Sequence, residues 1–154
     1  MNEIGQKLKL GETSTADAIV NILPQLRGHA PDDTLSWLVN ELQGYANSID
    51  FYQVNNHHLP AYRVVKGSLM LMNTSGNLTQ LNHPFAKRGQ YFLAAPIAWL
   101  EEFAGLPGEM ALAELPDLTS FLGSGKGTVV CQFTKDQLLS LLAQVKEKVL
   151  TIIN

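Results

Sequence analysis

The stretch from residue 35 to residue 63 decides how this chain folds. It reads Leu35-Ser36-Trp37-Leu38-Val39-Asn40-Glu41-Leu42-Gln43-Gly44-Tyr45, then a polar connection, then Leu59-Pro60-Ala61-Tyr62-Arg63. The apolar residues of its first half recur at helical spacing. Gly44 is expected to end that helix in a left-handed cap, because glycine has no Cβ to oppose this conformation. Pro60 favours extended backbone before it, and a strand is predicted to begin at Tyr62.

Five side chains at this helix-to-strand junction form the candidate site, namely Trp37, Glu41, Tyr45, Tyr62 and Arg63. They could form a recognition surface, because Trp, Tyr and Arg often anchor interfaces. They could instead be architectural, with Glu41 paired to Arg63 and the aromatic rings packed over the pair, because a partly buried ion pair needs such a frame. We predict a contact between Glu41 and Arg63 and favour the architectural interpretation.

The composition indicates a single domain over residues 1–154, in which residues 1–12 form either a short helix or a loose N-terminal arm. Apolar residues make up 45% of the chain and the net charge is −3, which argues against a general nucleic-acid surface. No apolar run approaches the ~20 residues that cross a bilayer, and no signal-peptide apolar region is present. The lone Cys131 cannot form an internal disulfide. We therefore expect a cytoplasmic protein without a membrane partner.

Helical signals flank the middle of the chain. The first strong helix is expected to start at Thr13 or Ser14, and Pro24 should kink or divide it. The last helix should follow Thr134, which forms a predicted capping box with Gln137. Its apolar stripe is the longest periodic signal in the sequence and consists of Leu138, Leu141, Leu142, Val145, Val149 and Ile152.

Extended runs lie between these helices, and they predict strands at residues 62–72, 78–81 and 128–133. The turn residues 73–77 should join the first two strands as a hairpin. Residues 109–122 are ambiguous and are predicted as one or two short helical turns broken by Pro116. The resulting fold class is α+β, with an N-terminal helical hairpin, a small antiparallel sheet of about three strands and a C-terminal amphipathic helix.

Other residue patterns that could suggest a functional site lack features that phosphate binding, thiol chemistry or metal binding requires. The glycine-rich run at 123–128 does not match a phosphate loop, which would need Gly where the chain has Ser120 and Ser or Thr where it has Gly127. The run also precedes a predicted strand rather than a helix, so a turn is expected. Cys131 lies in an apolar strand and is expected to be a core residue. The histidines are interpreted as solvated loop residues, namely His29, His57, His58 and His83. Several charges are interpreted as solvated, namely Glu101, Glu102, Glu109, Glu114, Lys146, Glu147 and Lys148. We expect neither a metal nor a cofactor.

Most of the chain resembles the AbiTii domain, a family named for abortive infection. The resemblance is carried by Trp37-x-x-x-Glu41-Leu42-x-Gly44-Tyr45, by Leu59-Pro60-Ala61-Tyr62-Arg63, by Ala95-Pro96-Ile97-Ala98-Trp99-Leu100-Glu101-Glu102 and by Val145-Lys146-Glu147-Lys148-Val149-Leu150. It implies a role in bacterial antiphage defence. Such domains occur alone or ahead of other domains, so the chain is expected to be either a stand-alone protein or an N-terminal domain.

The sequence leaves two functions open. The first is a non-catalytic sensing or interaction module whose partner is a defence effector, a phage component or a second copy of itself. The second is a small toxin-like enzyme, such as a nuclease, that uses Glu41, Arg63 and a histidine. A closed ion pair covered by Trp37 would favour the module, and an open cleft holding a carboxylate, an arginine and a histidine would favour the enzyme.

Overall fold

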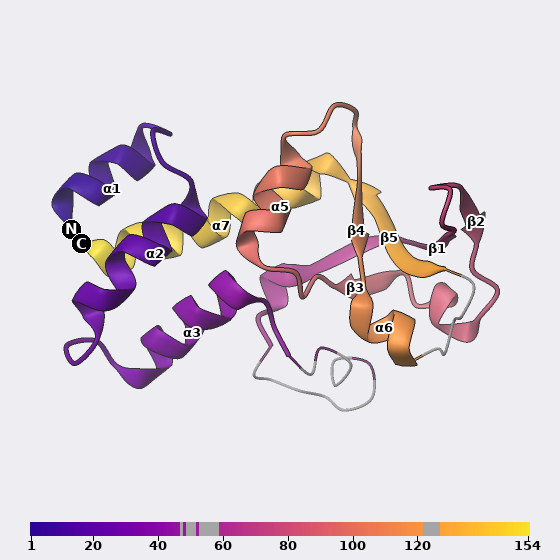
Figure 1. Cartoon of the computed structure of the whole chain (residues 1–154), viewed down its shortest axis with the longest axis horizontal. Helices are drawn as coiled ribbons and strands as arrows, with labels where there is room; N and C mark the ends of the chain where they lie inside the picture. Colours follow the sequence, from indigo (N-terminus) through magenta and orange to yellow (C-terminus); the bar gives the residue numbers. More distant parts are fainter. Residues whose placement is uncertain (47, 49–51, 53–58, 122–126) are drawn as a thin grey trace.

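The computed structural model describes residues 1–46, 48, 52, 59–121 and 127–154 (Figure 1). The helices of this part are α1 (Asn2–Lys9), α2 (Thr15–Leu26), α3 (Asp32–Gln43), α5 (Ile97–Ala104), α6 (Pro116–Phe121) and α7 (Lys135–Ile153). The strands are β1 (Val64–Met72), β2 (Leu78–Gln80), β3 (Gln90–Phe92), β4 (Met110–Glu114) and β5 (Thr128–Thr134). Two short 3₁₀ turns are η1 (Ala61–Arg63) and η2 (Pro84–Lys87). The predicted α+β class is confirmed.

The five strands form one antiparallel sheet with β1 at its centre. The strand order is β2-β1-β5-β4, and β3 pairs with the first residues of β1. The predicted hairpin of β1 and β2 is confirmed, with Met72 opposite Leu78. The sheet is larger than the expected three strands, because β3 and β4 also join it. As the last strand in the order, β4 lies at one edge of the sheet.

The expectation of helical turns at residues 109–122 is wrong for the first half of that range. There β4 pairs with β5 and buries Ala111 and Ala113 on one face. Helix begins only at Pro116, the first residue of α6, where its missing N–H does no harm. Met, Ala, Leu and Glu favour helices in isolation, so pairing with β5 overrides the local preference.

The strand predicted from Tyr62 begins two residues later, at Val64. Residues 61–63 form the turn η1 instead, in which the Arg63 N–H donates to the Pro60 carbonyl over 3.2 Å. The chain therefore turns once more before it enters the sheet, and this turn carries both Tyr62 and Arg63.

The three N-terminal helices gather at one end of the molecule around the C-terminal half of α7, and the sheet forms the other end (Figure 1). The two chain ends lie side by side where α1 packs on α7 (Figure 1). A Cβ on Gly5 would lie 3.2 Å from the Ile153 side chain. Residues 2–9 are therefore a docked helix with Leu8 buried, and not a loose arm.

The core lies between the sheet and the helices, and the predicted stripe of α7 supplies much of it. Its buried members include Ile19 and Ile22 of α2, Val65 and Leu69 of β1, Val129, Cys131 and Phe133 of β5, and Leu138, Leu141, Val145 and Val149 of α7. Cys131 is a core residue, as predicted, and its burial raises the pKa of the thiol to about 12. No helix in the described part has the length and apolar character that a membrane span requires.

The start of α2 follows the sequence prediction. The Ser14 hydroxyl accepts a hydrogen bond of 3.0 Å from the Asp17 N–H and so caps the helix. Pro24 does not divide α2, which continues through it to Leu26 with the proline on its exposed side. Of the glycine-rich turn predicted at residues 123–127, residues 123–126 lie outside the described residues.

The predicted capping box at the start of α7 is wrong. Thr134 is the N-cap residue, but its hydroxyl accepts from the Gln137 side-chain amide and not from the helix backbone. The same amide of Gln137 binds both the N–H and the carbonyl of Lys66, each over 2.8 Å. The Gln137 side chain therefore links the first turn of α7 to β1 by hydrogen bonds, which the local sequence does not predict.

Candidate functional site

The five predicted site residues meet in one cluster, which we call the clamp: Trp37, Glu41, Tyr45, Tyr62 and Arg63. Helix α3 presents Trp37 and Glu41 one turn apart, and Tyr45 follows the end of that helix. The turn η1 places Tyr62 and Arg63 against them. The cluster therefore joins α3 to the start of the central strand, β1.

The ion pair at the centre of the clamp is bidentate. Arg63 Nη2 lies 2.7 Å from Glu41 Oε1, and Arg63 Nε lies 3.1 Å from Glu41 Oε2. Both side chains are 0% exposed. The predicted contact between Glu41 and Arg63 is therefore confirmed, and the pair is fully closed to solvent.

Every remaining polar group of the pair also has a partner. The phenols of Tyr45 and Tyr62 both donate to Glu41 Oε2, the latter over 2.6 Å. Trp37 Nε1 donates in turn to the Tyr62 hydroxyl over 2.7 Å. Among the described residues, no buried side-chain nitrogen or oxygen lacks a partner. Such complete pairing is what allows two charges to remain inside the fold.

Arg63 also fixes a neighbouring backbone segment. Its Nη1 donates to the carbonyls of Leu93 and Ala95 over 2.8 and 2.6 Å, and its own carbonyl accepts from the Leu93 N–H. The guanidinium carbon lies 4.7 Å from the centre of the Tyr45 ring, which in turn meets Phe92 edge-on. One arginine therefore links α3 to the segment that connects β3 with α5.

The clamp makes its phenols hard to ionise. Burial, together with the charge of the Glu41 carboxylate, raises the pKa of Tyr45 and of Tyr62 well above the usual value. Burial also raises the pKa of Tyr52 and Tyr91, so all four tyrosines of the chain are shifted in the same direction.

We expect Tyr45, Tyr52 and Tyr62 to remain un-ionised near pH 10 while the protein is folded, although tyrosines of an unfolded chain ionise there. The stability that depends on neutral phenols is fully present below about pH 10 and is lost as the pH rises beyond it, because only the unfolded chain then releases its protons easily. The ultraviolet absorbance of tyrosinate, followed with pH together with circular dichroism, measures this. Titration in concentrated urea is the control, and ionisation of more than one tyrosine near pH 10 in folded protein would contradict the expectation.

The two described histidines do not join the clamp. His83 Nδ1 accepts from the Phe85 N–H over 3.2 Å, and its ring stacks on the Phe85 ring. His29 follows the end of α2 and is exposed. His57 and His58 lie outside the described residues. Within the part of the chain that the structure describes, no three His, Cys, Asp or Glu residues are grouped so as to hold a metal ion.

Two charges that were expected to be merely solvated have specific contacts. Glu101 accepts hydrogen bonds from the N–H groups of Thr15 and Ala16, over 2.9 and 3.1 Å, and so caps α2 from α5. Lys148 is exposed, but its Nζ lies 4.3 Å from the centre of the Trp37 ring. Sequence spacing could not predict either contact, because each joins elements that are distant in the chain.

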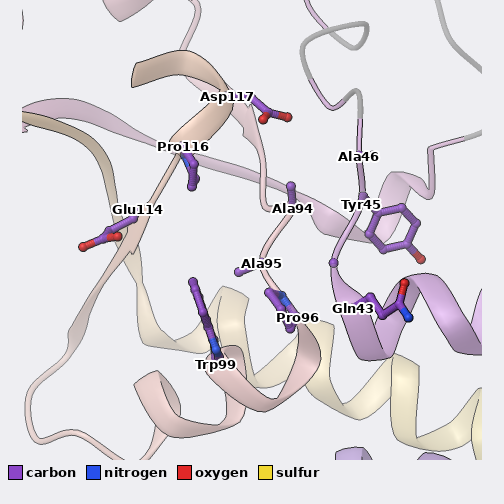
Figure 2. A pocket seen from close by; sticks show the side chains of 11 residues that line it. Gln43, Tyr45, Ala46, Ala94, Ala95, Pro96, Trp99, Glu114, Pro116 and Asp117 are labelled. Carbon is purple, nitrogen blue, oxygen red and sulfur yellow. The ribbon is translucent and has the colours of Figure 1, made fainter. Parts of the chain in front are cut away.

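A groove of about 480 Å³ lies beside the clamp (Figure 2). It is lined by Gln43, Gly44, Tyr45, Ala46, Ala94, Ala95, Pro96, Trp99, Glu114, Pro116 and Asp117. The clamp and the groove share Tyr45. Sequence reasoning did not predict the groove, although Trp99 belongs to a segment that carries the family resemblance. The only sequence signal was a run of small residues, Ala94 and Ala95, shortly before that tryptophan.

The chain matches no protein-family model, no curated protein and no solved structure. What the site can do must therefore be inferred from its own geometry, with the resemblance to AbiTii domains as an expectation.

Proposed function

We propose that the protein is a non-catalytic sensing or interaction module of a bacterial antiphage defence system of the abortive-infection type. The observation that carries the non-catalytic part is the closed ion pair, in which Glu41 and Arg63 are both 0% exposed. A carboxylate that acts as a general base must reach its substrate. Glu41 instead accepts from Arg63 and from two phenols, so no substrate atom can approach it.

The defence role is supported by the resemblance to AbiTii domains. Its most distinctive segment supplies all five members of the clamp, so the residues that carry the likeness also hold the fold together at this point. The clamp in turn holds the backbone of residues 93–95, beside which the groove lies. We propose that the partner is recognised at this groove, and that it is a defence effector, a phage component or a second copy of the chain.

A phage challenge tests the proposal. The protein is expressed in a bacterial host together with its native neighbouring genes, and plaque formation is compared for the wild type, Trp99→Ala and Leu139→Ala. Trp99 and Leu139 are both 49% exposed, but only Trp99 lines the groove. We expect protection with the wild type and with Leu139→Ala, and loss of protection with Trp99→Ala.

A biochemical assay separates this function from the toxin-like enzyme. Purified protein should leave RNA and DNA intact under conditions in which it is folded. Degradation that disappears in Glu41→Gln, with the fold of that variant verified by circular dichroism, would replace the proposed module by a nuclease. Absence of any protection against a broad phage panel would instead remove the defence role.

A further inference from the structure

The floor of the groove is held in one shape by the clamp. Arg63 Nη1 binds the carbonyls of Leu93 and Ala95, and the Tyr45 N–H donates to the carbonyl of Ala94 over 2.9 Å. Three successive carbonyls are therefore already engaged. The floor that remains is a fixed, mainly apolar surface at Ala94 and Ala95, which needs little ordering when a ligand arrives.

The walls of the groove are apolar and partly open to water. The Trp99 indole stands beside Ala95 and Pro96 at one end, and Pro116 faces it from the other side (Figure 2). Trp99 is 49% exposed, an unusual setting for so large an apolar ring. Tryptophan on a concave surface is a frequent anchor of protein interfaces.

The charges around the groove have one sign. Two carboxylates line it, Glu114 on the outer rim and Asp117 at the start of α6, and none of the described residues that line it is Lys, Arg or His. Asp117 Oδ2 accepts hydrogen bonds from the N–H and the hydroxyl of Ser48, but these neutral donors do not cancel its charge. The nearby Arg63 is paired with Glu41 and contributes little net field.

We propose that the groove binds a lysine or arginine side chain presented by a segment of a partner protein, an inference that rests on the proposed function. The apolar stem of such a side chain fits the alanine floor and the Trp99 ring. Glu114 and Asp117 lie at different ends of the groove (Figure 2), so its cationic head meets one of the two carboxylates. Because Trp99 and Glu114 remain in contact with water, a ligand is held from one side only. That is how a groove holds a peptide segment, whereas most small-molecule sites enclose their ligand.

Capped peptide mixtures test this directly. The mixtures share the same randomised flanks and differ only in a central arginine, lysine, glutamine or glutamate. They are passed over immobilised full-length protein, and the retained peptides are quantified by mass spectrometry. We expect the basic mixtures to be retained about tenfold more than the glutamate mixture. Retention should fall about tenfold in Trp99→Ala and about two- to fivefold in Glu114→Gln.

Matched variants exclude general effects of charge and exposure. Glu102→Gln removes an exposed carboxylate from α5 outside the groove, and Leu139→Ala removes an exposed apolar side chain from α7. Both should retain the peptides as the wild type does. Glu114 is exposed on the rim, so Glu114→Gln keeps the test decisive even if Trp99→Ala fails to fold.

Three results would overturn the inference. They are equal retention of basic and acidic mixtures, retention that is unchanged in both groove variants, and full displacement of the peptides by acetyl-arginine amide at equal concentration. The last result would identify a small cationic molecule as the ligand. If phage protection depends on Trp99 while the mixtures show no charge preference, the proposed function stands and only the ligand class is wrong. If basic peptides bind but protection is absent, the defence role alone is wrong.

Discussion

Arg63→Ala should lower the free energy of unfolding by about 3–5 kcal/mol, because it leaves the Glu41 carboxylate buried without its counter-charge. The carbonyls of Leu93 and Ala95 lose their donor in the same variant. An ordinary domain is stable by only about 5–15 kcal/mol, so the loss would be a large part of the total. Urea denaturation followed by circular dichroism measures it. Glu41→Ala should be similarly costly, since it leaves the guanidinium uncompensated.

The double variant Glu41→Ala with Arg63→Ala is the informative partner of these single variants, because it combines the same two substitutions. Removing both charges leaves no unpaired ion, so its cost should be smaller than the sum of the two single costs by about 2 kcal/mol or more. The exposed pair of Glu3 and Lys7 on α1, 3.6 Å apart, is the control and should show a coupling below about 0.5 kcal/mol. Additive costs at Glu41 and Arg63 would mean that the pair does not act as one closed unit.

The clamp could be predicted from the sequence because its members lie in two short segments with clear local signals. Helical spacing placed Trp37 and Glu41 one turn apart, and the segment after Pro60 brought Arg63 to the same junction. A carboxylate and an arginine there had few other partners. The hydrogen bonds of Arg63 to residues 93 and 95 could not be predicted in this way, because no local pattern indicates which distant carbonyls a buried arginine will reach.

The groove and the strand β4 could not be predicted, for a related reason. Residues 110–114 favour a helix by composition, and only pairing with β5 makes them a strand. No sequence motif marks Trp99 as part of a site, and its exposure depends on how α5 packs against β4. Both features are consequences of tertiary packing, which a single sequence does not report.

A glycine connects the clamp to the groove. Gly44 ends α3 with φ 92° and ψ 166°, so its φ is positive as predicted, but its ψ differs from that of a left-handed helical cap. Side chains other than hydrogen are strained in this region. A Cβ would also lie 2.8 Å from the Ala94 carbonyl oxygen and 3.1 Å from Pro96 Cδ. The close approach lets the Tyr45 N–H reach that same carbonyl.

Gly44→Ala should therefore lower the free energy of unfolding by about 3 kcal/mol, from the strained backbone and from the displaced Ala94 carbonyl together. Gly76→Ala is the matched control, because Gly76 has a similar φ of 81° but nothing within 4 Å of its Cβ position, so only the conformational cost of about 1 kcal/mol remains. Thermal and urea denaturation of both variants give the difference. Equal costs would mean that residues 93–95 yield freely, so the floor of the groove would not be the fixed surface that the clamp is inferred to hold.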